Sequence, residues 1–503
     1  MSFAKVHTRS VIGLNAPQVE VEVHLSQGLP ALTIVGLPEA AVRESKDRVR
    51  SALINSGFEF PNRRLTINLA PADLPKDGSR LDLPIALGIL AASGQIDDKI
   101  LDGFEFIGEL ALNGELRAIT GALSVARAIK NMPDTRQLIV PTSNAIEAAK
   151  VGGITVLSAD TLASVCRHLD VVCGVNRNQA DLLPIAPTPE CGEVVSYQQD
   201  LADVKGQHHA RRALEIAAAG GHSLLFKGTP GSGKTMMASR LPSILPPLTD
   251  AEALEVASIY SIAGVEYRFG ERPFRAILQG ISPAALIGGG GGSKPKPGEI
   301  TLGHHGVLFI DEILEFDRKA LEMLRQPIES GEVTISRANT KVTFPADFQL
   351  IAAMNPCPCG YHGDPSNRCV CRPEQVKKYQ ERLSGPLLDR IDLHITVPAL
   401  PIDDLQNAPT GEPSSVVRER VIKARQIAIA RQGKANYELT PSELDGVAKL
   451  GEHEQQMLKL ASARLNLSAR SYHRILRVAR TIADLAGADM IGSAHLAEAL
   501  SYR

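Results

Sequence analysis

The sequence predicts a multidomain α/β protein whose last part is all helical, and three observations predict it. Strand-like and helical runs alternate over residues 1–175, and they alternate again over 196–401, as in a mostly parallel sheet. Only helical runs follow over 402–503. Residues 176–195 contain three prolines and little periodicity, so we expect a linker there between the first two domains.

The clearest individual elements have simple hydrophobic patterns. VEVEVHL (19–25) and LTINLA (65–70) predict strands, because their apolar residues either alternate with polar ones or form a continuous run. EAAVRESKDRVRSALINSG (39–57) has apolar residues at helical spacing and ends on a glycine stop signal. Two later amphipathic helices are expected at 416–432 and 469–487, and their strongly basic polar faces favour nucleic acid as a partner, with solvated surface faces as the alternative.

The composition is that of an ordinary globular protein. Hydrophobic residues make up 44 % and charged residues 22 % of the 503 residues, and the formal net charge is −2. This balance neither favours nor excludes nucleic acid, so that question depends on local patches. No apolar run approaches the roughly 18 residues of a membrane span, and the first residues do not resemble a signal peptide. We therefore expect a cytoplasmic protein with no membrane contact.

A phosphate-binding loop is predicted where SLLFKGTPGSGKT (223–235) joins an apolar strand to Gly-x-x-x-x-Gly-Lys-Thr. Glycines let backbone N–H groups converge on phosphate oxygens, and the following helix N-terminus adds positive potential. Lys234 would reach the β- and γ-phosphates of ATP, and the Thr235 hydroxyl would ligate Mg²⁺. The predicted nucleotide-binding residues are Gly228, Thr229, Pro230, Gly231, Ser232, Gly233, Lys234 and Thr235.

A second buried strand, GVLFIDEI (306–313), ends in two acids. We expect Asp311 to complete the Mg²⁺ shell and Glu312 to polarise the attacking water. An apolar strand that ends in Asp-Glu is a weak signal alone, but it is a strong one downstream of a phosphate loop.

With these two motifs the chain resembles the AAA+ ATPases, in particular the branch with magnesium-chelatase subunits and the MCM helicases. DVKGQHHARRAL (203–214) is similar to the helix beside the adenine, and QLIAAMNP (349–356) to the sensor-1 strand. LSGPLLDRIDL (383–393) is similar to the segment that supplies an arginine finger, and SARSYHRIL (468–476) to sensor 2.

This resemblance implies further catalytic residues. Asn355 would orient the water, Arg390 would be the finger, and Arg470, with Arg474 as the alternative, would be the sensor-2 arginine. Solvated surface charges remain the other interpretation of these arginines. If Arg390 acts on a neighbouring subunit, the site is completed only between subunits, and the resemblance implies a ring, a homohexamer.

Two loops are candidates for contact with DNA in the pore of such a ring. GEVTISRANTKVTF (331–344) predicts a β-hairpin, and it resembles the pore hairpin of this branch, with Arg337 and Lys341 beside its tip. The loop 288–296 has five glycines followed by Lys294 and Lys296. Exposed loops without a ligand are the alternative.

The N-terminal part resembles the Lon-type protease domain over residues 69–90 and 107–130. Aligned on the Lys-Asp-Gly triplet, the nucleophile position holds Arg80 and the lysine position holds Ser124. A shift of one residue would offer Ser79 as the hydroxyl but would not restore the lysine. A Ser–Lys dyad needs both groups, so we expect an inactive, Lon-like platform for ring assembly or DNA contact.

The stretch NPCPCGYHGDPSNRCVC (355–371) has two Cys-x-Cys pairs after the sensor-1 strand. Four thiolates match a structural Zn²⁺ site in number and softness, and His362 is a substitute ligand. Free thiols with local packing and redox-labile disulfides remain as alternatives. The predicted ligands are Cys357, Cys359, Cys369 and Cys371.

Taken together, the chain is similar over its whole length to the YifB/ComM family of bacterial magnesium-chelatase-like ATPases. The resemblance implies an ATP-dependent DNA motor, a helicase or branch-migration enzyme acting on single-stranded or branched recombination or transformation intermediates. It implies no porphyrin metallation. The alternative is an ATP-dependent protein remodeller without a nucleic-acid ligand, whereas Arg80 and Ser124 disfavour an active protease.

Overall fold

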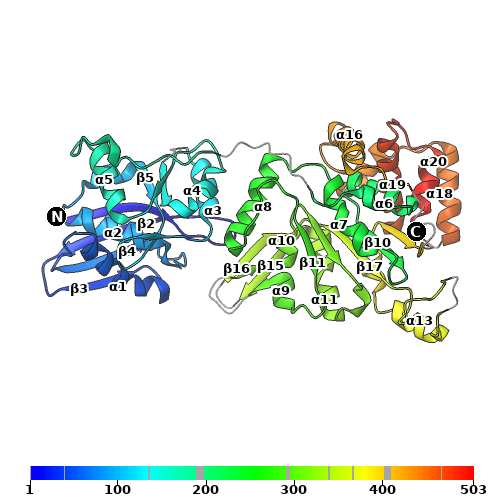
Figure 1. Cartoon of the computed structure of the whole chain (residues 1–503), viewed down its shortest axis with the longest axis horizontal. Coiled ribbons are helices and arrows are strands. Elements are labelled where there is room, and N and C mark those ends of the chain that lie inside the picture. The colour runs from blue at the N-terminus through cyan, green and yellow to red at the C-terminus, as the bar shows by residue number, and fades with distance from the viewer. Residues whose placement is uncertain are drawn as a thin grey trace. The chain divides into compact units, whose positions relative to one another are not determined.

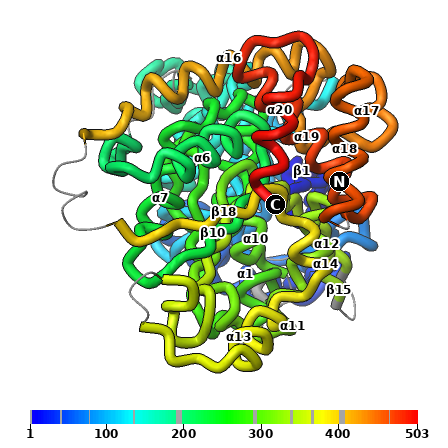
Figure 2. The backbone as a smooth tube through the Cα atoms, turned by 90° about the vertical axis from the view of Figure 1, so that its right-hand side faces the viewer, coloured from blue at the N-terminus to red at the C-terminus, as the bar shows by residue number. Residues whose placement is uncertain are grey.

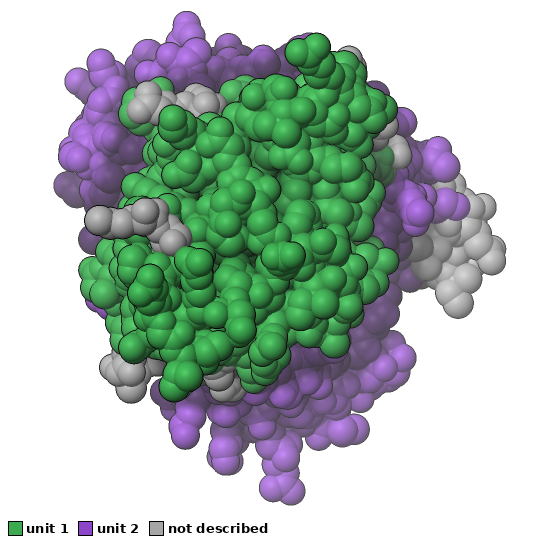
Figure 3. Space-filling model, turned by 90° about the vertical axis from the view of Figure 1, so that its left-hand side faces the viewer, with its two compact units in different colours: residues 1–193, 254–269 green, residues 194–253, 270–503 purple. Residues whose placement is uncertain are grey.

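The computed structural model consists of two compact units, which Figure 3 shows in two colours. Unit 1 comprises residues 1–193 and 254–269, and unit 2 comprises 194–253 and 270–503. The residues that the structure describes are 2–38, 40–76, 78–133, 136–188, 197–289, 295–337, 340–364, 368–400, 409–465 and 467–503.

Unit 1 is built around a four-stranded sheet in the order β1-β2-β4-β3 (Figure 1). Pairs β1–β2 and β2–β4 are antiparallel, and β3–β4 is parallel. The predicted strands at 19–25 and 65–70 and the helix at 39–57 are confirmed. Their bounds are β1 (Ser2–Arg9), β2 (Gln18–Ser26), β3 (Ala31–Val35), α1 (Ala40–Asn55), β4 (Arg64–Ala70) and α2 (Asp82–Ala92).

The rest of unit 1 forms a parallel sheet in the order β5-β8-β9, a short ribbon β6–β7 and several helices. Residues 254–269, which the sequence analysis placed within 196–401, belong to this unit, and Ala257 is buried with Val11 and Leu123 in one cluster. The elements are η1 (Ser79–Leu81), η2 (Asp98–Gly103), β5 (Phe104–Phe106), β6 (Glu109–Leu110), β7 (Leu116–Arg117), α3 (Ala122–Lys130), β8 (Gln137–Pro141), α4 (Thr142–Ala149), β9 (Val156–Ala159), α5 (Leu162–Val172) and η3 (Gln179–Asp181).

Unit 2 contains a five-stranded parallel sheet in the order β11-β14-β17-β10-β18. The inner strands β14, β17 and β10 have mostly continuous apolar sequences because helices cover both faces of such a sheet. All carboxyl ends of these parallel strands lie at one edge, where the predicted nucleotide motifs follow. The strands are β10 (Leu224–Gly228), β11 (Phe274–Ile277), β14 (Val307–Ile310), β17 (Gln349–Met354) and β18 (Leu393–Val397).

Helices and two hairpins surround this sheet. The predicted hairpin at 331–344 is confirmed as the antiparallel pair β15–β16, although residues 338 and 339 lie outside the described residues, as do 290–294 with Lys294. The elements are η4 (Leu201–Asp203), α6 (His208–Gly220), α7 (Lys234–Ile244), α9 (Pro283–Ile287), β12 (Gly288–Gly289), β13 (Lys296–Pro297), α10 (Glu299–Leu302), η5 (Ile313–Glu315), α11 (Arg318–Met323), α12 (Arg325–Ser330), β15 (Glu332–Arg337), β16 (Thr340–Pro345), α13 (Pro373–Gln380) and α14 (Gly385–Leu388). Helix α8 (Asp250–Ala263) begins in unit 2, but its residues from Leu254 onward belong to unit 1.

The C-terminal part is helical, as predicted, and its helices belong to unit 2. Figure 2 shows them in orange and red beside α6, and α16, α19 and α6 share one hydrophobic core with β10. No helix in the described part of the chain is long and apolar enough to cross a membrane. The helices are α16 (Ser414–Gln432), η6 (Asn436–Glu438), α17 (Pro441–Val447), α18 (Glu452–Leu465), α19 (Ala469–Leu485) and α20 (Ser493–Leu500).

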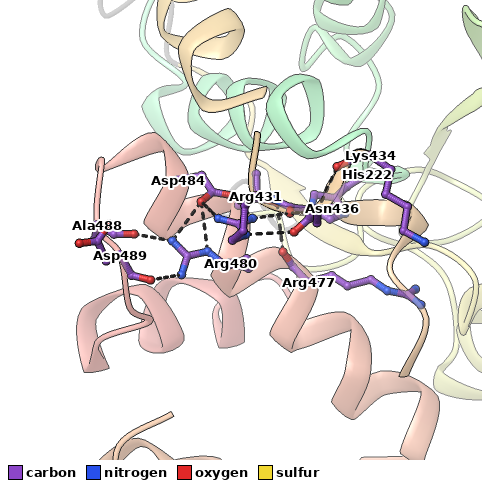
Figure 4. A network of polar contacts seen from close by, with 11 residues as sticks. His222, Arg431, Lys434, Asn436, Arg477, Arg480, Asp484, Ala488 and Asp489 are labelled. Atoms are coloured by element: carbon purple, nitrogen blue, oxygen red, sulfur yellow. Dashed lines mark hydrogen bonds and ion pairs between the residues drawn. The ribbon is translucent and has the colours of Figure 1, made fainter. Parts of the chain in front are cut away.

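A buried polar network joins these helices (Figure 4). Asp484 on α19 accepts hydrogen bonds from Arg431 at 2.6 and 3.0 Å, from Arg480 at 3.1 Å and from Asn436 at 2.8 Å. Arg420 on α16 is likewise held, 2.6 Å from Glu215 on α6. Several arginines on the two basic faces predicted to favour nucleic acid therefore make internal contacts, which weakens that argument for DNA.

Candidate active site

The phosphate loop follows β10 and ends at Gly233, the N-cap of α7. Gly233 has φ +88°, in the left-handed region that favours glycine. Gly228 is required for a different reason, because a Cβ there would lie 2.4 Å from the Val397 carbonyl oxygen on β18. The loop therefore turns tightly into a helix N-terminus, which is the geometry that binds phosphate.

Lys234 lies inside this loop and is 7 % exposed. Its Nζ donates to the carbonyl oxygens of Gly228 and Thr229, at 2.9 Å each, and to Asn355 Oδ1 at 3.2 Å. Burial lowers the pKa of the Lys234 ammonium, and the charges of the nearby acids oppose that shift. The lysine thus contacts neutral oxygens only, and an anion would be a stronger partner.

The predicted magnesium ligands are adjacent. Thr235 Oγ1 donates to Asp311 Oδ2 at 2.5 Å, and Asp311 Oδ1 accepts the Glu312 N–H at 2.9 Å. In the described part of the chain the buried hydroxyls of Thr229 and Ser232 have no hydrogen-bond partner. Hydroxyl and carboxylate oxygens suit Mg²⁺, and unpartnered hydroxyls suit phosphate oxygens. These residues therefore fit a magnesium nucleotide.

Glu312 is held by two amides at the end of β14. Its Oε2 accepts from Gln279 Nε2 at 2.7 Å, and its Oε1 lies 3.5 Å from Asn355 Nδ2. The backbone of Glu312 has φ +48°, a conformation uncommon for a residue other than glycine and frequent at functional sites. Asn355 thus touches both Lys234 and Glu312.

Gln279 was missed in the sequence analysis. A single glutamine belongs to no motif, but it lies two residues past the carboxyl end of β11, at the sheet edge that carries the other site residues. That position was the one signal that pointed to it.

Arg390 lies at the opposite end of the sheet from the phosphate loop. Its carbonyl accepts from Ser223 Oγ at 3.0 Å, just before β10 begins, and β10 pairs with β18 in parallel. Five rises of about 3.3 Å separate Ser223, which contacts Arg390, from Gly228 at the start of the phosphate loop, a distance of roughly 16 Å. Neither Arg390 nor Arg470 forms a hydrogen bond or ion pair with the phosphate loop among the described residues; both are bound to Glu329, at 2.5 and 3.4 Å.

Arg474, the alternative to Arg470, has a different environment. Its Nε lies 3.3 Å from Asp392 Oδ1, and the side chain is 11 % exposed. Burial lowers the pKa of Arg474 to about 10. Although burial alone would raise the pKa of Asp392, His222 and Arg474 hold it well below its usual range. This is a buried structural ion pair, whereas the Arg470 side chain is 59 % exposed.

The four cysteines of the loop after β17 converge. The sulfur atoms of Cys357, Cys359 and Cys369 lie 3.3, 3.8 and 3.7 Å apart, and Cys371 completes a cluster within 4.8 Å. A tetrahedral zinc site with bonds of ~2.3 Å separates its sulfurs by about 3.8 Å, whereas a disulfide needs ~2.05 Å. All four cysteines are free thiols in this structure. The arrangement fits a zinc tetrathiolate, and of His362 only the backbone N–H contacts it, at 3.3 Å from Cys357 Sγ.

The cysteine loop also packs against the phosphate loop. A Cβ at Gly360, which has φ +85°, would lie 2.6 Å from the ring of Pro230. Gln380 on α13, the helix that extends past the end of β17 in Figure 1, donates to the Pro356 carbonyl at 2.8 Å. The cluster therefore supports one wall of the nucleotide site.

In unit 1 the positions that align with the serine and lysine of a Lon-type protease are Arg80 and Ser124, so neither catalytic side chain is present there. Arg80 is 7 % exposed, and its Nη1 lies 3.7 Å from where a Cβ of Gly121 would be, at the start of α3, which carries the buried Ser124. Ser79 donates to Glu109, and the fully buried Lys76 donates to a backbone carbonyl. No serine–lysine contact occurs among the described residues of this region.

A parallel sheet of this order, with a phosphate loop after β10, an Asp-Glu pair after β14 and an asparagine after β17, defines a P-loop ATPase of the AAA+ class. Family models agree: residues 200–405 match magnesium chelatase, subunit ChlI, residues 21–144 match subunit ChlI of Mg-chelatase, and residues 411–503 match its C-terminal model.

Curated relatives match the whole chain. Competence protein ComM of Haemophilus influenzae is 50 % identical over 511 residues, covering all of this chain and 98 % of that protein. Proteins named YifB from Salmonella typhimurium and Escherichia coli are each 48 % identical over all of this chain and 97 % of their own length. The chain belongs to the YifB/ComM family of magnesium-chelatase-like proteins and is an ATPase of that family, which implies ATP and Mg²⁺.

Proposed function

We propose that the protein is an ATP-driven DNA motor, a helicase or branch-migration enzyme that works as a homohexameric ring on single-stranded or branched recombination or transformation intermediates. The main support for a ring is the separation of roughly 16 Å along β10 between the Arg390 backbone and the phosphate loop of the same chain. A finger that cannot reach its own nucleotide serves another subunit. The relative named competence protein supports the DNA substrate.

Within one subunit, the phosphate loop and two strand ends bind and activate the nucleotide. Lys234 would exchange its carbonyl partners for phosphate oxygens, and Thr235 and Asp311 would hold Mg²⁺, which would supply positive charge against the phosphates. Glu312 polarises the attacking water once Gln279 releases its carboxylate, and Asn355 orients that carboxylate and the water.

The arginine side of the neighbouring subunit completes the site. Arg390 and Arg470 lie within reach of one carboxylate, Glu329, so they would reach one phosphate group together. Arginine stabilises charge on the transferred phosphoryl group, and its loss from such a site costs about three orders of magnitude or more in rate.

DNA contact is assigned to the β15–β16 hairpin and to the loop between β12 and β13. Lys341 on β16 is exposed, Lys296 on β13 is exposed, and Arg337 is the last residue of β15. Together with Lys294 these residues offer one positive charge each to the DNA backbone.

One observation favours the protein remodeller as the second candidate: the arginines of α16 and α19 that favoured DNA are bound internally. Filter binding to a four-way junction at low salt decides between the two. We expect sequence-independent binding whose salt slope falls by about one unit in Lys341→Ala. Absence of DNA binding at low salt supports the remodeller instead.

The remaining assignments concern structure rather than chemistry. We infer that the cysteine cluster holds one structural zinc ion, and that unit 1 is a Lon-like domain without peptidase activity, serving ring assembly or DNA contact. The sulfur spacing supports the first, and the arginine and serine at the dyad positions support the second. A casein-degradation assay that detects ATP-dependent proteolysis would contradict the second.

A further inference from the structure

Three arginine side chains gather near one carboxylate at the end of α12. Glu329 Oε1 lies 2.5 Å from Arg390 Nη2 and 3.4 Å from Arg470 Nη2. Arg325, one turn earlier on the same helix, is 2.6 Å from Glu322. Four of these residues line a surface pocket of about 450 Å³, and Arg470 lies beside it. With three cations and two anions the cluster keeps one uncompensated positive charge.

Arg390 is the buried centre of this cluster, with its side chain 6 % exposed. Its Nη1 donates to the Pro386 carbonyl at 2.6 Å, but its buried Nε has no hydrogen-bond partner within the described chain. A guanidinium presents five donors in a fork that fits planar or tetrahedral oxyanions. One carboxylate oxygen of Glu329 therefore satisfies only part of what Arg390 can bind.

Glu329 is the exposed member of the pair, with 49 % of its side chain accessible. The hydrogen bond with Arg390 lowers the pKa of the Glu329 carboxyl, and the charges of Arg470 and Arg325 act in the same direction. The carboxylate thus stays ionised at neutral pH while remaining open to replacement from solution. A terminal phosphate carries more negative charge and more acceptor oxygens than a carboxylate.

We propose that Glu329 is an internal stand-in for the terminal phosphate of a neighbouring subunit's nucleotide. In the free subunit it holds Arg390 and Arg470, and the phosphate displaces it when the ring closes. The inference rests on the proposed action of Arg390 in trans. As a consequence, Glu329 occupies Arg390 and Arg470 until the nucleotide-bound phosphate loop of the next subunit is in place. Glu329 therefore raises the subunit concentration at which ATP hydrolysis becomes half-maximal.

A purely structural role for Glu329 predicts the opposite sign. If the carboxylate only orders the two arginines, removing its charge leaves them less well placed and weakens hydrolysis. If it occupies the place of the phosphate, removing its charge frees them and favours the completed interface. The direction of the effect therefore separates the two roles.

The experiment isolates the arginine side by mixing subunits. Arg390→Ala subunits keep the phosphate loop and Lys234→Ala subunits keep the arginines, so a mixture hydrolyses ATP only where the two meet. At a fixed amount of Arg390→Ala, the Lys234→Ala donor is titrated with and without Glu329→Gln. We expect half-maximal hydrolysis at roughly threefold to tenfold less donor when Glu329→Gln is present.

Glu322→Gln in the donor is the matched control, because it removes the same charge from the same pocket without touching Arg390; we expect no shift. Glu329→Asp, whose carboxylate is one carbon shorter, should give a smaller shift of the same sign, and thermal unfolding shows that each donor is folded. An unchanged or higher donor requirement in both Glu329 variants overturns the proposal. A mixture that co-assembles yet never hydrolyses ATP instead overturns the action of Arg390 in trans, and the inference with it.

Discussion

The phosphate loop and the arginine cluster lie at opposite ends of the same parallel strands, and they satisfy their charges differently. At the loop, Lys234 contacts only neutral oxygens, and the Thr229 and Ser232 hydroxyls have no partner among the described residues. At the cluster, Arg390 faces the ionised Glu329. The loop is ready to accept an anion, whereas the cluster already contains one.

Under the proposed action of Arg390 on a neighbouring subunit, this difference means that one subunit contains two halves of a site. A buried lysine near neutral oxygens costs little to transfer to phosphate, because it gains charge complementarity. A buried arginine that loses its carboxylate partner must gain another anion at the same time, because an unpaired buried charge is strongly destabilising. We therefore expect the first half to bind nucleotide alone and the second to act only in an assembly.

The largest effects are expected at the phosphate loop. Lys234→Ala should abolish nucleotide binding, and Glu312→Gln should keep binding while hydrolysis falls by about a hundredfold or more, because only the carboxylate polarises water. Equilibrium binding of a fluorescent ATP analogue and phosphate release measure the two steps. Hydrolysis by Glu312→Gln near the wild-type rate would show that the carboxylate is not the water-activating group.

On the arginine side, we expect Arg390→Ala to bind ATP normally and to lose about three orders of magnitude in hydrolysis. Arg470→Ala should show a smaller loss with unchanged folding stability. Arg474→Ala is the control: it leaves Asp392 buried without its ion pair and should lower the free energy of unfolding by about 3 kcal/mol. A stable Arg474→Ala variant with impaired hydrolysis would exchange the roles of the two arginines.

Changes in the cysteine cluster should affect ATP hydrolysis less directly than changes in the phosphate loop or the arginine cluster. Protein purified without chelator should contain about one zinc per chain, and Cys357→Ser should lower the metal content and the melting temperature, because the loop behind Pro230 has little core of its own. Cys173→Ser, which removes a thiol outside the cluster, should do neither. Zinc that persists in a variant lacking all four cysteines would place the metal elsewhere.

The smallest effect is expected from Gln279→Ala. Loss of its hydrogen bond frees Glu312, so basal hydrolysis should rise by roughly threefold to fivefold, about the net value of one typical intramolecular hydrogen bond. Gln380→Ala, which removes an amide that binds only a backbone carbonyl, is the control. Steady-state phosphate release without DNA measures the change. A decrease would mean that Gln279 positions the carboxylate for catalysis.

Sequence patterns predicted that the residues around the phosphate loop lie together, as they do, but gave no sign of Glu329 beside Arg390 and Arg470. Asp311 and Asn355 follow directly on apolar strands, and Lys234 follows the short phosphate loop after β10, so parallel pairing brings all three to one edge. Glu329 acquires its partners through tertiary packing with distant segments, which no local pattern encodes. Periodicity likewise gave the position of Arg431 on a helix face but not the Asp484 carboxylate that covers it.

Strand exchange on a synthetic four-way junction at low salt, followed with and without ATP, tests the proposed DNA motor most directly. The proposed function predicts junction binding, ATP hydrolysis stimulated by the junction, and separated duplex products that appear only with hydrolysable ATP. Glu312→Gln should bind the junction and yield no product, which ties movement to hydrolysis. An active ATPase that neither binds the junction nor forms ATP-dependent product would contradict the DNA motor and leave the protein remodeller.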